Sequence, residues 1–270
     1  MLVSIIIPNY NYANFLEICI LSVLNQTHQN FEVIIIDDCS SDNSLQIANK
    51  FVYDSRIKIF KNTQNYGVCY CRNKGIEESQ GEYICFLDPD DYWLSSKLEK
   101  QLNAINTQNS NLSFTDIDVL KNQQIVHTRK HFYKKYNFNT LLKRNFIPHS
   151  SLMIKKETIG GLRYKTVQAN SQYIDWLLKV SHINRLIHED YAFLLELYRT
   201  RSIKSSYIAE SLVVYRTHEK NFSKSYRKKF LSLFFIYKNY EKYSFLFSCF
   251  FTVRIMIFAF WKNKIKSQSD

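Results

Sequence analysis

Apolar runs alternate with amphipathic stretches through about the first 155 residues of this 270-residue chain. Three short runs, Val3–Ile7, Phe31–Ile36 and Tyr83–Leu87, have the length and the β-branched or aromatic content of buried strands. Between them lie segments with helical spacing, among them Phe15–Leu24 and Val68–Glu78. This alternation is typical of a mostly parallel sheet flanked by helices, so we expect an α/β, Rossmann-like fold.

The pattern is weaker in the second half of the chain, where the apolar runs are less regular. Strands are expected over Ile57–Phe60, Leu112–Leu120, Ser150–Ile154 and Ser211–Tyr215, and a helix over Asp190–Leu197. Residues 159–185 have an ambiguous helical pattern. Ser96, with Glu99 three residues later, resembles a capping box that begins a helix over Lys97–Asn106.

The last segment differs from the rest in composition. Tyr243–Trp261 is almost entirely apolar or aromatic, contains Arg254 as its one charge, and has lysines on both sides. Its length is close to the roughly 20 apolar residues of a membrane-spanning helix, but a central arginine costs about 2.5–3.5 kcal/mol on insertion scales. A helix lying on an anionic membrane surface fits better, and a helix packed on the domain or on a dimer partner is the alternative.

The charge distribution supports a division into domain and tail. The formal net charge is +12, and residues 216–270 contain 12 Lys+Arg against 3 acids, a difference of +9. We expect residues 1–222 to form one domain with two halves, 1–110 and 111–222. Residues 223–270 would form a basic, aromatic helical tail associated with a membrane.

Two further features bear on the compartment. The six cysteines have neither a C-x-x-C pair nor metal-ligand spacing, which indicates reduced thiols in a cytosolic protein. The N-terminal segment is typical of a first strand and has no charged start or cleavage site, so a signal peptide is not expected. We therefore expect a cytoplasmic protein, peripheral on the inner face of the cell membrane.

Three carboxylates, Asp88, Asp90 and Asp91, directly follow the third apolar run. Ligands of open α/β sheets bind beyond the carboxyl ends of the strands, and carboxylates this close repel one another unless a cation offsets them. Mg²⁺ and Mn²⁺ typically use one or two carboxylates plus substrate phosphates. The cluster is a candidate site for a metal-bound nucleoside diphosphate, and a solvated acidic turn is the alternative for so short a motif.

Four strings in register now carry a family resemblance: VSIIIPNYNYANFLEICILSVLNQT, FEVIIIDDCSSDNS, NYGVCYCRNKGI and GEYICFLDPDDYW. They cover about the first hundred residues and resemble the family-2 glycosyltransferases, which have the GT-A fold. Cys39 and Cys71 stand where the family usually has Gly and Ala. The resemblance implies an inverting transfer from a nucleotide-sugar donor, by default a UDP-sugar, with Mn²⁺ or Mg²⁺. The acceptor would be a glycan or a lipid-linked molecule in bacterial surface polysaccharide assembly, such as lipopolysaccharide or capsule.

The nucleotide base needs a flat platform and a polar partner. The Pro8-Asn-Tyr10 string offers the platform, with Tyr10 as the stacking ring, and Asp38 can accept a hydrogen bond from a base N–H. The alternatives are that Tyr10 is a turn aromatic and that Asp38 caps a helix.

The diphosphate needs positive charge as it leaves the sugar. A metal held by Asp90 supplies it as a Lewis acid. By resemblance, Asp88 lies near the ribose and the metal, and Asp91 supports the metal site or faces the acceptor. Arg72 either reaches the phosphates or braces the acidic strand end, and His218 joins the metal or the diphosphate.

An inverting transfer also needs a base that deprotonates the acceptor hydroxyl. The family places this base in a Glu-Asp motif at the start of a helix. Glu189 and Asp190, in IHEDYAFLLELYRTRSIKSSYIAESLVVYRTHEKNFS, match that motif better than Asp175 in SQYIDWLLKVS. We assign Asp190 as the base. Simple capping of the helix by both carboxylates is the alternative.

Two other classes of function are weighed against this one. A catalytically inactive nucleotide-binding scaffold of the same fold is disfavoured because Asp38, Asp90 and Asp190 are all present. Nucleic-acid binding is disfavoured because the basic residues gather beside an apolar stretch and do not alternate with stacking aromatics. The expected partners are thus the donor, the acceptor and the membrane surface, with a homodimer as an alternative role of the tail.

Overall fold

The computed structural model describes residues 1–131, 133, 135–165, 189–217, 226–240 and 244–266. Its strands are β1 (Val3–Asn9), β2 (Phe31–Asp37), β3 (Ile57–Lys61), β4 (Tyr83–Phe86), β5 (Tyr92–Trp93), β6 (Leu112–Lys121), β7 (Gln124–Arg129), β8 (Met153–Lys155) and β9 (Ser205–Thr217). Its helical segments are α1 (Ala13–Leu24), α2 (Ser44–Asn49), α3 (Val68–Glu78), α4 (Lys97–Thr107), α5 (Phe138–Lys143), η1 (His149–Ser151), α6 (Lys156–Ile159), α8 (Glu189–Thr200), α9 (Tyr226–Phe235), η3 (Ile236–Tyr240) and α10 (Phe245–Lys266).

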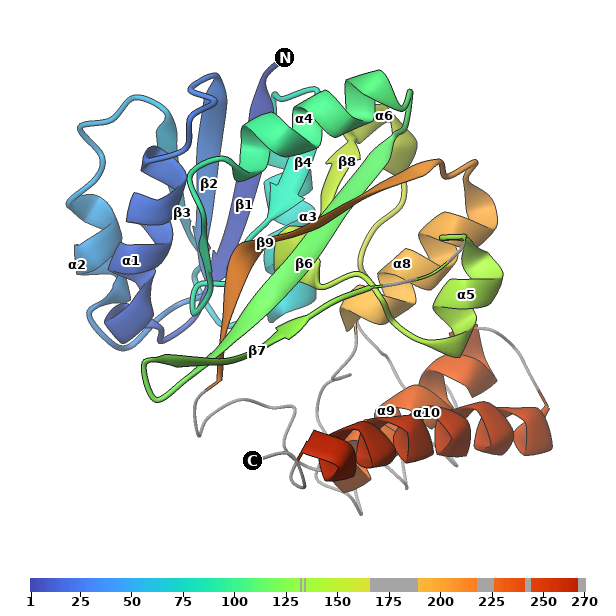
Figure 1. The fold of residues 1–270 in the computed structure, drawn as a ribbon. Helices are drawn as coiled ribbons and strands as arrows, with labels where there is room; N and C mark the ends of the chain where they lie inside the picture. The colour runs from blue at the N-terminus through green and yellow to red at the C-terminus, as the bar shows by residue number, and fades with distance from the viewer. Residues whose placement is uncertain (132, 134, 166–188, 218–225, 241–243, 267–270) are drawn as a thin grey trace.

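All the strands belong to one sheet, with the order β3-β2-β1-β4-β8-β6-β9-β5 and with β7 paired to β6 beside this path. The first four strands in this order are parallel to one another, and β6 is parallel to β9. β8 lies antiparallel between β4 and β6, so β4 and β6 point the same way (Figure 1). The expected mostly parallel α/β sheet is confirmed.

The apolar strands are covered by helices on both faces, as their continuous hydrophobic runs require. Alternate residues of β1 show the two layers. Ile5 and its odd-numbered neighbours pack with α1, α2 and α4, whereas Ile6 packs with α3 and α8. Gly75 allows α3 to lie close to β1, because a Cβ at this position would be 2.4 Å from Ile6 Cγ2. The helices therefore hold the strand ends at fixed positions.

Two expectations from the sequence are wrong in detail. The strand expected over Ser150–Ile154 begins only at Met153, because Ser150 lies in the 3-10 turn η1. Its hydroxyl donates to Asp91 in the acidic loop (residues 88–91), and its carbonyl accepts from the Trp93 indole. Ser96 is the residue before α4 but forms no capping hydrogen bond. The Glu99 carboxylate instead accepts a hydrogen bond from the Thr27 hydroxyl at 2.6 Å.

The C-terminal helices pack on the same core as the rest of the domain. Tyr237 is fully buried and its hydroxyl donates to the Leu142 carbonyl at 2.9 Å. The ring of Phe251 in α10 lies 5.4 Å from the ring of Tyr237. Among the helices of the described residues, none has the length and apolar character needed to cross a membrane. The domain boundary expected at residue 222 stays a prediction, and the contacts show that α9 and α10 are attached to the core.

Candidate active site

The carboxyl ends of β1, β2 and β4 meet at one edge of the sheet, at the bottom of Figure 1. The Asn9 side chain donates to Asp37 Oδ1 at 2.9 Å, and the Asp38 backbone N–H donates to the Asn9 carbonyl at 2.8 Å. The three polar strand ends found in the sequence are thus assembled at a single edge. This edge is the candidate active site.

The carboxylate of Asp91 anchors the acidic loop, residues 88–91, to two other parts of the domain. It is 1% exposed, and it accepts hydrogen bonds from the Ser150 hydroxyl at 2.6 Å and from the Arg216 backbone N–H at 3.1 Å. The Arg216 guanidinium also donates to the Asp90 carbonyl at 3.1 Å. Burial, together with repulsion from Asp90 and Asp88, raises the pKa of Asp91. Asp91 therefore fixes the loop to η1 and to the end of β9.

Arg72 joins the acidic loop to the start of α8. Its guanidinium is 4% exposed and donates to Asp88 Oδ1 at 2.9 Å and to Glu189 Oε1 at 2.8 Å. Hydrogen bonds between ionised partners are about twice as strong as neutral ones. The contacts match the bracing role considered for Arg72, whereas its contact with phosphates stays a prediction.

The expected base, Asp190, lies in the first turn of α8 beside this ion pair. Burial raises the pKa of Asp190, Arg72 lowers it, and the negative charge of Asp88 raises it further. The net effect is a raised pKa, which makes the carboxylate a stronger base. Arg72 binds both Asp88 and Glu189, so the acidic loop after β4 and the first turn of α8 lie on either side of its guanidinium.

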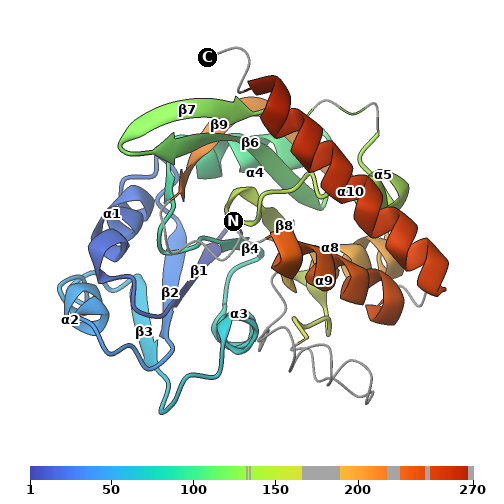
Figure 2. The same cartoon turned by 90° about the horizontal axis from the view of Figure 1, so that it is seen from below.

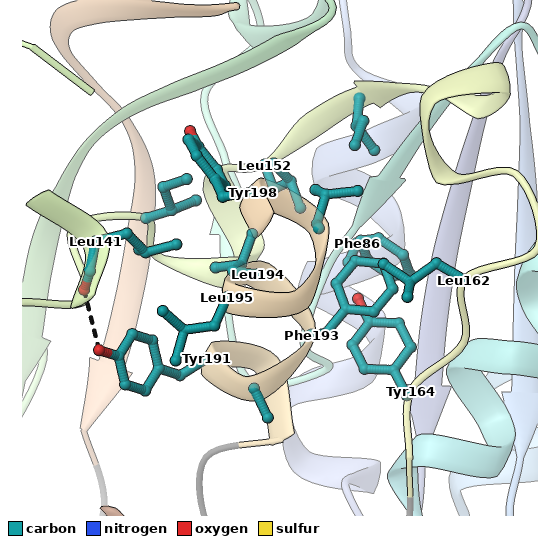
Figure 3. Close-up of a cluster of buried hydrophobic side chains, with 14 of the residues drawn as sticks. Phe86, Leu141, Leu152, Leu162, Tyr164, Tyr191, Phe193, Leu194, Leu195 and Tyr198 are labelled. Atoms are coloured by element: carbon teal, nitrogen blue, oxygen red, sulfur yellow. Dashed lines mark hydrogen bonds between the residues drawn. The ribbon is translucent and has the colours of Figure 1, made fainter. Parts of the chain in front are cut away.

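A packed core holds α8 rigidly. Tyr191, next to Asp190, is 1% exposed, and its hydroxyl donates to the Leu141 carbonyl at 3.0 Å. Figure 3 shows Leu194, Leu195 and Tyr198 pointing from α8 into a cluster of buried apolar side chains. Tyr164 stacks on Phe193 with ring centroids 4.1 Å apart. The first turn of α8 is therefore supported by the domain interior.

The residues expected to bind the nucleotide base differ in exposure: the Asp38 carboxylate and Pro8 are buried, and Tyr10 is exposed. The Asp38 carboxylate is 3% exposed and accepts hydrogen bonds from the Asn62 side chain and from the backbone N–H groups of Tyr66 and Gly67, at 2.7–2.9 Å. It thus fixes the loop that precedes α3, and its contact with a base stays a prediction. Tyr10 is 43% exposed and is open to stacking, while Pro8 is buried in β1.

The substitution of Cys39 has a backbone consequence. Cys39 has a φ of 62°, in the left-handed region that favours glycine, the residue that the family usually has here. Its thiol donates to the Thr63 carbonyl. Cys71 is 1% exposed and receives a hydrogen bond from the Asn62 side chain.

Sequence reasoning missed three residues that touch or face the acidic loop: Tyr12, Ser150 and Arg216. Burial and the charges of Asp90, Asp88 and Asp91 raise the pKa of the Tyr12 phenol, so this phenol lies within electrostatic reach of the three carboxylates. Arg216 stands in the Tyr-Arg-x-His string, which offered a signal. Ser150 offered none, because its role depends on a contact with residue 91.

The next question is whether the side chains at this edge could ligate a divalent cation. Among the described residues no group of three or more His, Cys, Asp and Glu side chains could hold a metal ion, and both His218 and Asp175 lie outside those residues. The carboxylate oxygens of Asp88 and Asp90 are nevertheless hard ligands, and their charge raises the pKa values of both Asp91 and Tyr12. This excess negative charge fits a Mg²⁺ or Mn²⁺ ion that uses one or two carboxylates and completes its coordination with phosphate oxygens.

Comparisons with known proteins agree with this geometry. Residues 4–161 match the sequence model described as "Glycosyl transferase family 2". The chain is 35% identical to an "Uncharacterized glycosyltransferase" of Haemophilus influenzae over 97% of its own length and 98% of that protein. It is 33% identical to the Escherichia coli "UDP-Glc:alpha-D-GlcNAc-diphosphoundecaprenol beta-1,3-glucosyltransferase WfgD" over 68% of its own length and 73% of that protein.

The fold is similar to that of a solved structure of S. aureus TarS, residues 1–349, in complex with UDP-GlcNAc. The TM-score is 0.65 at 19% sequence identity, over 88% of this chain and 67% of that one. The family model covers more than half of the 270 residues, includes the acidic strand end, and ends before α8. From the sequence match and the arrangement of the sheet together, we conclude that the chain belongs to glycosyl transferase family 2 and has the GT-A fold.

Proposed function

We propose that the protein is an inverting glycosyltransferase that moves a sugar from a UDP-sugar to a lipid-linked glycan acceptor in bacterial surface polysaccharide assembly. The observation that carries this proposal is the Arg72 bridge, because it brings the Glu189–Asp190 helix start against the acidic end of β4. The similarity to a protein whose name specifies UDP-Glc and a diphosphoundecaprenol-linked acceptor supports the donor and acceptor classes.

The chemistry follows from these positions. Asp190 accepts the proton of the acceptor hydroxyl, the acceptor oxygen bonds to the anomeric carbon, and the bond from that carbon to the diphosphate breaks. Attack opposite the leaving group inverts the anomeric configuration. Asp90, and Asp88 where it reaches, would hold a divalent ion, which would supply positive charge for the departing diphosphate. Tyr10 provides an exposed ring on which the nucleotide base of the donor stacks.

An inactive scaffold is the second reading, and the site residues argue against it. The chain has each carboxylate that the reaction requires, and Asp190 lies on a helix fixed by the core. A scaffold would need only the nucleotide-binding half. The raised pKa of Asp190 is a property that a catalytic base uses and that nucleotide binding does not require.

The outward face of α10 supports peripheral attachment to a membrane. Leu246, Phe250, Val253 and Ile257 form one helical stripe and are 78%, 59%, 43% and 52% exposed. The opposite side packs on the core through Phe251, Ile255 and Met256. The exposed Arg254 and the Lys262, Lys264 and Lys266 sequence positions give the helix a basic character suited to anionic headgroups.

The donor site can be tested by ligand-induced stabilisation. UDP with Mn²⁺ should raise the unfolding temperature, because a ligand that binds only the folded state stabilises it by about 2.7 kcal/mol at a hundred times its Kd. Asp90→Ala should abolish this shift in thermal unfolding, whereas Glu210→Ala, which changes an exposed carboxylate paired with Lys100, should keep it. An undiminished metal-dependent shift in the Asp90 variant would disprove the metal assignment.

The base can be tested by kinetics. Asp190→Asn should lower kcat/KM by about 10²–10⁴-fold and leave UDP affinity unchanged, since proton transfer is lost and donor contacts are kept. Glu196→Gln on the same helix, which removes the ion pair with the half-exposed Lys165, should leave kcat/KM nearly unchanged. Sugar transfer at normal rates by the Asp190 variant would contradict the assignment.

The pH dependence gives a second readout for Asp190. The base must be ionised, so activity falls as pH drops through its pKa. Burial raises that pKa, and the acid limb of kcat/KM should therefore lie above the ordinary aspartate range. Rates that stay constant down to that ordinary range would mean that Asp190 is not the group whose ionisation is required.

The membrane face can be tested with vesicles. Leu246→Ser combined with Phe250→Ser should weaken binding to phosphatidylglycerol-containing vesicles by about tenfold or more, because each CH₂ removed from lipid costs about 0.8 kcal/mol. UDP affinity should not change. The control is Val52→Ser with Tyr53→Ser, an exposed apolar pair just before β3 at the opposite, amino edge of the sheet. Failure of the unmodified protein to bind at low salt would disprove attachment, and a dimer that dissociates in the variant would assign the stripe to a second copy.

A further inference from the structure

The hairpin of β6 and β7 has a polar turn, and two exposed apolar side chains follow it in β7; we call residues 122–126 the tip. Ile125 is 50% exposed and Val126 is 51% exposed. Because successive side chains of a strand point to opposite faces, these two residues place one exposed apolar side chain on each face of the hairpin. Asn122 and Gln123 form the turn with φ values of 49° and 63°, the two positive values of a type I′ hairpin turn.

This tip lies outside the core of the domain. Within the described sheet β7 pairs only with β6, so its other edge is open. Exposed apolar edge strands invite unwanted pairing and are usually blunted by charge or cover. Neither Ile125 nor Val126 belongs to a buried cluster, so packing within the chain does not account for them.

The charged residues of the hairpin from its turn onward, and of the segment directly after β7, have one sign. Residues 119–135 contain five Lys or Arg residues and no Asp or Glu. Lys121 and Lys130 are exposed at the two ends of the hairpin, and the Arg129 guanidinium lies 5.0 Å from the centroid of the Tyr215 ring. The nearest acid on β6, Asp118, accepts a hydrogen bond from the Thr128 hydroxyl. Apolar side chains bordered by cations match the boundary of an anionic lipid surface.

The topology places the tip on the same side as the active site. β6 points the same way as β4, so the turn after β6 lies at the edge where β1, β2 and β4 end. In Figures 1 and 2 this edge also carries α10, whose C-terminal end is directed toward β7. The two exposed apolar elements thus flank one side of the domain.

We propose that the β6–β7 hairpin tip is a second lipid-contacting element that acts together with α10. The inference rests on the proposed attachment of α10 to the membrane. A domain attached by one interfacial helix can rotate about the axis of that helix. A second contact fixes the tilt of the domain relative to the membrane surface. The two contacts together hold the carboxyl edge of the sheet toward the lipid surface, where a lipid-linked acceptor is presented.

The test compares the full chain with two double variants on vesicles of phosphatidylglycerol and phosphatidylcholine. Ile125→Ser with Val126→Ser should weaken vesicle binding by about tenfold, because the contacts act in the same bound state and their contributions multiply. The control pair Val52→Ser with Tyr53→Ser should bind like the unmodified protein. UDP-induced thermal shifts should be equal in all three proteins, which verifies folding and donor binding.

Depth is measured separately with Val126→Trp and Tyr53→Trp. Brominated lipids should quench the added fluorescence of the first variant and not that of the second. Hairpin variants that bind like the unmodified protein, while the α10 variant is weakened, would overturn the hairpin contact and leave the attachment of α10 standing. An unmodified protein that does not bind vesicles would overturn both. A hairpin variant that changes only the oligomeric mass would assign the tip to a second copy and overturn the lipid contact.

Discussion

The buried guanidinium of Arg72 is the interaction on which the proposed site depends. It bridges Asp88 after β4 and Glu189 at the start of α8, two segments that the sequence separates by about a hundred residues. A buried charge is costly unless it is paired and hydrogen-bonded, and the two terminal nitrogens of Arg72 donate to the two carboxylates at distances below 3 Å. The half proposed to bind the donor and the helix proposed to carry the base are thus joined by one residue of α3.

A second constraint is the crowding of negative charge around the acidic loop. Asp91 is satisfied by Ser150 and by the backbone of Arg216, so its carboxylate is committed to the fold. The charges of Asp88 and Asp90 still raise the pKa values of Asp91 and Tyr12. In our account, a cation and the substrate phosphates complete this arrangement. The loop is rigid because its anchors lie on β9 and η1, which are fixed by the sheet.

The sequence predicted those features that depend on local pattern. The helix over Val68–Glu78 matches α3, and the continuous apolar runs of β1 and β2 correctly indicated strands covered on both faces. The order of the strand ends was enough to place Asp38 and Asp88 at one edge of the sheet. These features follow from side-chain periodicity and from the handed, parallel connection of β–α units.

Features that depend on distant partners were not predictable in the same way. β9 is longer than the strand expected over Ser211–Tyr215, because it pairs with β6 along Ser205–Thr217 through two register shifts. Glu99 bonds to Thr27 and does not close a capping box, and only the fold brings these side chains together. Ser150 and Arg216 are site residues because they bind Asp91 and Asp90, and only the folded chain brings these residues together.

A double-mutant cycle between Arg72 and Glu189 tests the central claim most directly. The free energy of unfolding is measured for the unmodified protein, Arg72→Met, Glu189→Gln and the double variant. A direct, buried, charged hydrogen bond predicts a coupling energy of about 1.5–3 kcal/mol. Each substitution should therefore lower the free energy of unfolding more in the unmodified protein than in the variant that already lacks the partner. Effects that add to within about 0.5 kcal/mol would show that the two residues do not interact and would contradict the account.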